Sequence, residues 1–199
     1  MNLVAITQRV LDEAKQNERR DALDQRWINL LSAANLCPLI LPNNLEQAQT
    51  LINSIPIKGI ILTGGNDLFD YAGNAPERDQ LETWLLKYAE ETRMPILGVC
   101  RGMQCILHNE GVKLTKVDNH VRVSQTITIN GSREQVNSYH NWAAYEAPHA
   151  YQIFAIADDA VIKGIKSLDK RVTGIMWHPE RIMPFRYEDI DLLKEMFVT

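Results

Sequence analysis

The stretch ILGVCRGMQ, residues 96–104, decides how the rest of the sequence is interpreted. Its first half is a short apolar run that predicts a buried strand, and its second half continues into a helical run. Cys100 stands at the junction, between Gly98 and Gly102. A strand that turns sharply into a helix leaves little room beside the turn, so flanking glycines favour a nucleophile elbow with cysteine in place of serine. The alternative interpretation is a buried cysteine followed by an ordinary glycine turn.

Such a cysteine would project from the carboxyl end of a sheet, where open α/β folds bind their ligands. The helix that begins behind it would offer backbone N–H groups and the positive end of its dipole to an anion. Both properties suit a thiolate nucleophile.

Apolar runs and helical spacings alternate on both sides of this stretch. We expect strands at residues 3–7, 39–41, 59–63 and 95–99, separated by helices with apolar faces at residues 23–34, 45–55 and 76–88. This alternation predicts a parallel sheet with helices on both faces. After about residue 115, β-branched alternation around the turn Asn130-Gly131 predicts antiparallel strands that return to residues 172–177, and a terminal helix follows. The expected fold is therefore a single α/β domain over residues 1–199, with a mostly parallel sheet and antiparallel strands in its C-terminal half.

Composition excludes several classes of protein. The 21 basic and 25 acidic residues give 21 − 25 = −4, which argues against a nucleic-acid partner. No apolar stretch approaches the ~18 residues of a membrane span, and the N-terminal residues lack the pattern of a secretory signal, so we expect a cytoplasmic protein. Three cysteines do not suit a disulfide framework, and the cysteines and histidines form no close pairs of the kind that bind zinc.

A cysteine nucleophile needs a base and a group that orients the base. His178 follows an apolar strand in GIMWHPE, and Glu180 lies on the same side of an extended segment, where its carboxylate would fix the tautomer of the ring. The alternative is a surface His–Glu contact of little energetic value. His140 is the second candidate, which we interpret as a binding residue. We expect the other histidines, His108, His120 and His149, to be solvated, together with the acidic run at 189–195. We expect Cys37 and Cys105 to lie in the core.

Three segments resemble, in order and spacing, the class I glutamine amidotransferase-like family, whose fold is flavodoxin-like: ILTGGNDL at 61–68, ILGVCRGMQ at 96–104 and GIMWHPE at 174–180. RRDALDQRW, PERDQLE and VNSYHNWA resemble its γ-glutamyl hydrolase branch. The resemblance implies a catalytic triad, an oxyanion hole of two backbone N–H groups, and contacts to the glutamyl group and its α-carboxylate. Cys100, His178 and Glu180 stand at the triad positions, and Gly65 and Arg101 stand at the positions of the two N–H groups. Gln104 matches the position that holds the glutamyl group, and Ser138, Tyr139 and His140 match the segment that holds its α-carboxylate.

The resemblance implies hydrolysis of a small-molecule γ-glutamyl conjugate through a thioester, without a metal or cofactor. The branch suggests three leaving groups: a nucleotide-linked phosphoramidate used in capsule biosynthesis, an aminobutyrate or a polyamine. Residues 110–115 and 141–142 depart from the usual pattern of the branch on the leaving-group side. Two alternatives stay open. One is a glutaminase subunit that passes ammonia to a separate synthase, since no synthase domain is fused here, and the other is a non-catalytic binding relative. The oligomeric state, including a homo-oligomer, also stays open.

Overall fold

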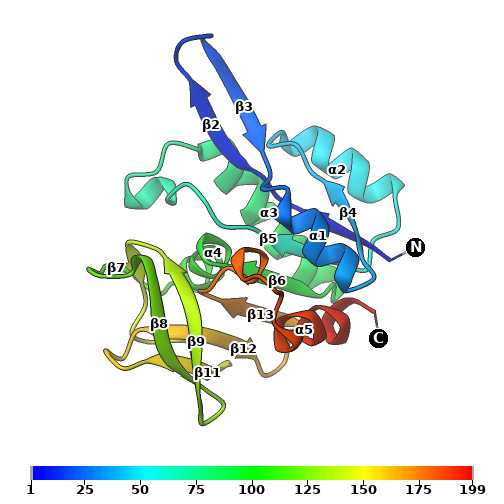
Figure 1. Cartoon of the computed structure of the whole chain (residues 1–199). Helices are drawn as coiled ribbons and strands as arrows, with labels where there is room; N and C mark the ends of the chain where they lie inside the picture. Colours follow the sequence, from blue (N-terminus) through cyan, green and yellow to red (C-terminus); the bar gives the residue numbers. More distant parts are fainter. Residues whose placement is uncertain (1, 199) are drawn as a thin grey trace.

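The computed structural model describes residues 2–198 of the chain. Within them, nine strands form one mixed sheet in the order β4–β1–β5–β6–β13–β12–β11–β8–β9 (Figure 1). The ladders from β4 to β13 are parallel, and those from β13 to β9 are antiparallel. The strands of this sheet are β1 (Leu3–Ile6), β4 (Cys37–Ile40), β5 (Gly59–Leu62), β6 (Ile96–Val99), β8 (Val121–Ile129), β9 (Ser132–Tyr139), β11 (Tyr151–Ala157), β12 (Ile162–Ser167) and β13 (Val172–Ile175).

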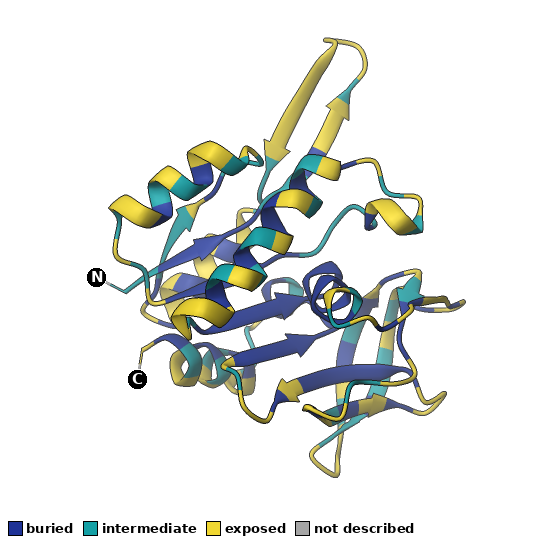
Figure 2. Cartoon of the chain, turned by 180° about the vertical axis from the view of Figure 1, so that it is seen from behind, coloured by how far each residue is buried: buried dark blue, intermediate teal, exposed yellow. Residues whose placement is uncertain are grey.

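Helices cover both faces of the parallel half, as the alternation predicts. Strands β5, β6 and β13 are buried at every position because each face of the sheet packs against a helical layer (Figure 2). The helices are α1 (Arg26–Ala33), α2 (Leu45–Ser54), α3 (Pro76–Thr92), α4 (Arg101–Asn109) and α5 (Tyr187–Phe197). Residues of α2, α3 and α4 share one apolar cluster, and those of α1 and α5 share the other. The predicted α/β fold with a large mixed sheet is confirmed.

Short elements complete the chain around the carboxyl edge of the parallel strands. The two-residue strands β7 (Thr115–Lys116) and β10 (Trp142–Ala143) pair with each other. Two 3-10 turns, η1 (Phe69–Tyr71) and η2 (Pro179–Arg181), follow the loops after β5 and β13. Every helix in residues 2–198 is too short or too polar to cross a membrane.

A hairpin that the sequence analysis did not predict lies between β1 and α1. Strands β2 (Arg9–Glu13) and β3 (Glu18–Ala22) pair antiparallel and extend away from the body of the molecule (Figure 1). Most of its residues are exposed and polar, so no apolar alternation marks it. Arg19 pairs with Asp12 at 2.6 Å within the hairpin and with Glu77 of α3 at 2.5 Å, and the second ion pair helps to attach the hairpin to the body of the molecule.

Three expectations about burial are wrong. His120 is only 1% exposed, and Asp189, within the acidic run, is 3% exposed because its carboxylate accepts a hydrogen bond from the indole of Trp177 at 2.9 Å. Cys37 lies on the edge strand β4 and is half-buried. The expectations for a buried Cys105 and an exposed His149 are confirmed. His108 is partly exposed and lies 3.1 Å from Asp70.

Candidate active site

Cys100 occupies a strained turn between β6 and α4. Its backbone has φ 53° and ψ −105°, which side-chain-bearing residues rarely adopt. The Cys100 N–H donates to the carbonyl of Ile175 at 2.8 Å, so the turn is fixed to the neighbouring strand. The flanking glycines are sterically required: a Cβ on Gly102 would lie 2.2 Å from the Leu62 carbonyl oxygen, and one on Gly98 would lie 2.6 Å from the Gly102 carbonyl. The turn therefore has the geometry of a nucleophile elbow.

His178 and Glu180 reach the same sheet edge from the adjacent strand. Strands β6 and β13 are parallel, with Val99 opposite Ile175, so the segments after both strands emerge together. Nδ1 of His178 lies 2.7 Å from Oε1 of Glu180, and both side chains are 2% exposed, so this is not a surface contact. Burial alone would lower the pKa of His178. The charge and hydrogen bonding of Cys100, together with the Glu180 carboxylate, outweigh burial and raise that pKa to about 9.

Asn137 of β9 holds the backbone of His178 and was missed in the sequence. Its Nδ2 donates to the His178 carbonyl at 2.8 Å, and its Oδ1 accepts from the His178 N–H at 2.8 Å. The next residue but one, Tyr139, presents its ring edge-on to the His178 ring at 5.5 Å between centroids. Asn137 belongs to the VNSYHNWA segment, but nothing in that pattern shows that it faces a histidine 41 residues away.

The loop after β5 passes beside Cys100 and His178. A Cβ on Gly64 would lie 2.5 Å from Cε1 of His178 and 3.4 Å from Cβ of Cys100, so only glycine fits there. Gly65 has a φ of +89°, in the region that favours glycine. The two residues predicted to donate oxyanion-hole N–H groups, Gly65 and Arg101, thus belong to segments that border Cys100 on either side.

A buried ion-pair network joins these two segments. Glu82 of α3 is fully buried and accepts a 2.8 Å hydrogen bond from Nε of Arg78 and a further bond from the guanidinium of Arg101. Arg78 also donates to the carbonyl oxygens of Thr63 at 2.6 Å, of Gly64 at 3.2 Å and of Gly65. One carboxylate therefore ties both predicted oxyanion segments to α3. Burial would raise the pKa of Glu82, but the two guanidinium groups outweigh burial and lower it.

Two of the residues predicted to bind the substrate, Gln104 and His140, contact the carbonyl oxygen of Trp142. Nε2 of Gln104 donates to this oxygen at 2.7 Å, and Nδ1 of His140 lies 3.0 Å from it. Ser138 and His140 alternate with Tyr139 along the chain, so their side chains turn away from the face that Tyr139 presents to His178. They stay predictions as substrate contacts.

Lys163 of β12 is a buried cation behind these residues, and no sequence pattern pointed to it. Its Nζ lies 2.7 Å from Nε2 of His140, 2.9 Å from Nδ1 of His120 and 3.3 Å from Oγ of Ser138. Burial lowers the pKa of Lys163 to about 8, while burial and the adjacent ammonium lower that of His140 to about 2. His140 is therefore neutral and accepts from the lysine. His120 can be buried because both of its ring nitrogens have partners: Nδ1 contacts Lys163, and Nε2 contacts Asp159 at 2.7 Å.

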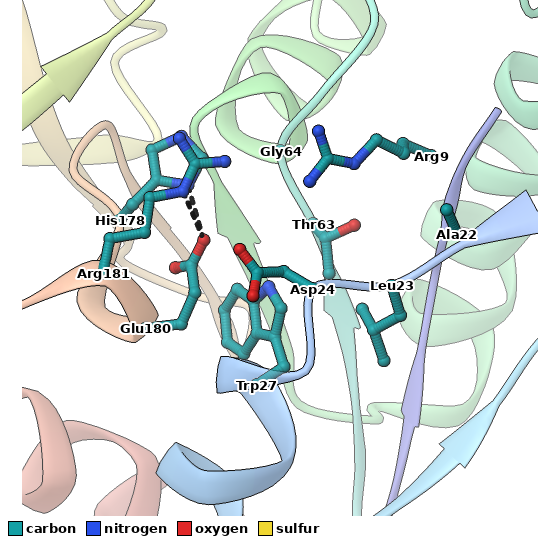
Figure 3. A pocket seen from close by; sticks show the side chains of 10 residues that line it. All are labelled: Arg9, Ala22, Leu23, Asp24, Trp27, Thr63, Gly64, His178, Glu180 and Arg181. Carbon is teal, nitrogen blue, oxygen red and sulfur yellow. Dashed lines mark hydrogen bonds and ion pairs between the residues drawn. The ribbon is translucent and has the colours of Figure 1, made fainter. Parts of the chain in front are cut away.

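A pocket opens beside His178, between the foot of the β2–β3 hairpin, the start of α1 and η2 (Figure 3). Arg9 lies on one side of this pocket and His178, Glu180 and Arg181 lie on the other, and Asp24 also contributes a charged side chain to the lining (Figure 3). The full lining is Arg9, Ala22, Leu23, Asp24, Trp27, Thr63, Gly64, His178, Glu180 and Arg181. In residues 2–198, no group of three or more His, Cys, Asp or Glu side chains is arranged to hold a metal ion.

Comparison with known proteins assigns the chain to a family. Residues 21–198 match the model of the class I glutamine amidotransferases. The chain is 31% identical to the γ-glutamyl-CDP-amidate hydrolase of Campylobacter jejuni, over 98% of this chain and 96% of that protein. It is 27% identical to one subunit of a glutamine-hydrolysing GMP synthase from Methanococcus maripaludis, over 77% and 79% of the two chains. The crystal structure of a Thermoplasma acidophilum protein, described as a GMP synthase subunit, superposes with a TM-score of 0.73 at 19% identity, covering 97% of this chain and 92% of that one.

Proposed function

The chain belongs to the class I glutamine amidotransferase family, and from this membership we propose that it hydrolyses the γ-glutamyl amide of a small-molecule conjugate and releases glutamate. One observation carries the proposal: a cysteine in a strained strand-to-helix turn lies beside a buried histidine that a buried carboxylate orients at 2.7 Å. The proposed roles are nucleophile for Cys100, general base and acid for His178, and orienting carboxylate for Glu180.

The first half of the proposed reaction forms a thioester. The Cys100 sulfur, whose proton is already on His178, attacks the γ-carbonyl carbon. The oxyanion that forms accepts hydrogen bonds from the backbone N–H groups of Gly65 and Arg101, and loss of one such donor costs about 10²–10³ in rate in other enzymes. The C–N bond then breaks, the departing nitrogen takes the proton from His178, and a γ-glutamyl thioester remains on Cys100.

The second half releases glutamate. His178 takes a proton from a water molecule, which attacks the thioester carbonyl, and the oxyanion again lies on the two N–H groups. The C–S bond breaks and leaves the sulfur beside the protonated His178, as at the start of the reaction. The Glu180 carboxylate stabilises the imidazolium in both halves. The reaction adds one water and yields glutamate and the free amine or amide.

For the leaving group, we propose a nucleotide-linked phosphoramidate, with γ-glutamyl-CDP-amidate as the substrate. The support is the similarity to the Campylobacter jejuni hydrolase along almost the whole of both chains. Capsule biosynthesis, which the sequence resemblance suggests, and a cytoplasmic location belong to the same proposal.

Glutamate release tests the function directly. The substrates are γ-glutamyl-CDP-amidate, γ-glutamyl-aminobutyrate, a γ-glutamyl polyamine and glutamine, each with wild type and Cys100→Ala. Cys37→Ala is a matched control, because it removes a half-buried thiol from the far edge strand. We expect turnover of one conjugate well above that of glutamine, loss of turnover in Cys100→Ala, and no change in Cys37→Ala. Turnover that survives Cys100→Ala would overturn the proposal.

A second function is supported by the similarity to a GMP synthase component: a glutaminase that delivers ammonia to a separate synthase. It predicts that glutamine is the preferred substrate and that its turnover rises when the synthase is added. The third alternative, a non-catalytic relative, predicts no turnover of any conjugate and is disfavoured by the presence of all three triad residues.

A further inference from the structure

The geometry points to Arg9 as the residue that selects a leaving group with a phosphoryl group bonded directly to the departing nitrogen. This inference rests on the proposed hydrolase function and deepens it. Arg9 is the first residue of β2, and Figure 3 shows its guanidinium directed into the pocket beside Gly64. The side chain lies along the oxyanion loop, since a Cβ on Gly65 would lie 3.2 Å from Cβ and 3.3 Å from Cδ of Arg9.

The guanidinium of Arg9 has no ion-pair partner among residues 2–198, whereas the acidic residues that line the same pocket are paired. Among residues 2–198, no carboxylate lies within ion-pairing distance of it and no acceptor takes a hydrogen bond from it. The two acidic residues that line the same pocket already have cations: Asp24 lies 2.6 Å from Arg26, and Glu180 lies 2.7 Å from His178. The pocket therefore presents an uncompensated positive charge that an anionic ligand can pair with.

The backbone that carries Arg9 is held against the oxyanion loop. The N–H of Val10 donates to Oδ1 of Asn66 at 2.9 Å, and Nδ2 of Asn66 donates to the Val10 carbonyl at 2.9 Å. This pair of bonds fixes the foot of the hairpin to the residue after Gly65. A fixed arginine binds an anion with less loss of conformational freedom than a mobile one, so it can discriminate between leaving groups.

The position of Arg9 separates the possible leaving groups by chemistry. With the carbonyl carbon at Cys100 and its oxygen toward Gly65, the departing nitrogen lies on the side of His178 and the pocket. A phosphoramidate carries its anionic oxygens on the atom next to that nitrogen, within the region that Arg9 borders. An aminobutyrate places its carboxylate several bonds farther out, and a polyamine brings a second cation toward the guanidinium. Only the first class matches the free positive charge in both sign and position.

Steady-state kinetics test the assignment with two substrates that differ at this atom. γ-Glutamyl-CDP-amidate has a phosphoryl group on the scissile nitrogen, and glutamine has none. We expect Arg9→Gln to lower kcat/KM for the phosphoramidate by roughly 10- to 100-fold, the range of a lost hydrogen-bonded charge contact, and to change glutamine turnover by less than about threefold. Arg9→Lys should recover part of the loss. Arg20→Gln is the matched control, since Arg20 lies on the same hairpin and pairs with Glu18 at 2.6 Å.

A binding measurement gives a result that does not depend on turnover. CDP is added while Cys100 is alkylated with iodoacetamide, and the concentration that halves the alkylation rate is measured. We expect CDP to protect wild type and Arg20→Gln equally, and Arg9→Gln to need at least about 10-fold more CDP. Absence of protection in wild type, equal protection in Arg9→Gln, or equal losses for both substrates would overturn the assignment of Arg9. Hydrolysis of γ-glutamyl amides without any preference for phosphoramidates would do the same while leaving the proposed hydrolase function intact.

Discussion

Replacement of Cys100 by glycine should make the protein more stable than replacement by alanine. At ordinary buried positions the order is reversed, because glycine loses more backbone entropy on folding, at a cost of about 0.5–1 kcal/mol. Cys100 has φ 53° and ψ −105°, and a residue with a Cβ in such a conformation carries strain of about 1–3 kcal/mol. Glycine relieves this strain and alanine retains it. The difference leaves Cys100→Gly more stable than Cys100→Ala by about 1 kcal/mol.

Cys105 provides the internal control for this experiment. It is 4% exposed, against 5% for Cys100, and lies inside α4 with ordinary helical geometry. At this position glycine should be less stable than alanine by about 1 kcal/mol. The glycine-minus-alanine difference in unfolding free energy should therefore have opposite signs at the two positions and differ between them by about 2 kcal/mol. Urea unfolding of the four variants, followed by circular dichroism with the m-value checked for constancy, measures both differences. If glycine is the less stable replacement at both positions, the strain assigned to the elbow is absent.

Three further predictions concern charge. Cys100→Ala should lower the pKa of His178 from about 9, because the contact with Cys100 raises this pKa and burial lowers it. NMR titration of the His178 ring measures the pKa, and an unchanged or higher value would contradict the prediction. Since the folded pKa lies above the unfolded value of 6.5, His178 stabilises wild type fully below pH 6.5 and loses this contribution as the pH rises through about 9, a dependence that urea unfolding should find reduced in Cys100→Ala. Glu82→Gln should lower kcat by about 10²-fold with a smaller change in KM, because both oxyanion segments lose their shared anchor; a change in KM alone would argue against this role. Burial raises the pKa of Asp189 above 3.8, so Asp189→Asn, which can still accept from Trp177, should stabilise the protein at pH 7 and lose that gain near pH 3; destabilisation at pH 7 would refute it.

The parallel half of the fold could be predicted because its strands and helices differ in periodicity. Residues 59–62 and 96–99 are continuous apolar runs, while helix α3 begins at Pro76 as its position predicts. The β2–β3 hairpin could not be predicted, because most of its residues are polar and it is attached by long-range contacts such as that of Arg19 with Glu77, 58 residues later.

The same distinction divides the candidate site. Cys100, His178 and Glu180 stand in local sequence patterns that predict their positions at strand ends, and the structure brings them to one sheet edge. Lys163 and Glu82 stand in no such pattern. Their importance comes from contacts across the fold, such as the 2.7 Å approach of Lys163 to His140, and no single-sequence pattern encodes a contact of that kind.

The central position of β13 has a consequence for synthesis of the protein. Strand β6, which leads to Cys100, pairs with β5 on one side and with β13 on the other, yet β13 lies more than 70 residues later. On the ribosome, therefore, β6 has an open edge until residues 172–175 emerge, and an apolar unpaired edge can recruit other strands. His178 arrives only with that same segment. The nascent chain thus cannot bring His178 beside Cys100 before this apolar edge is closed.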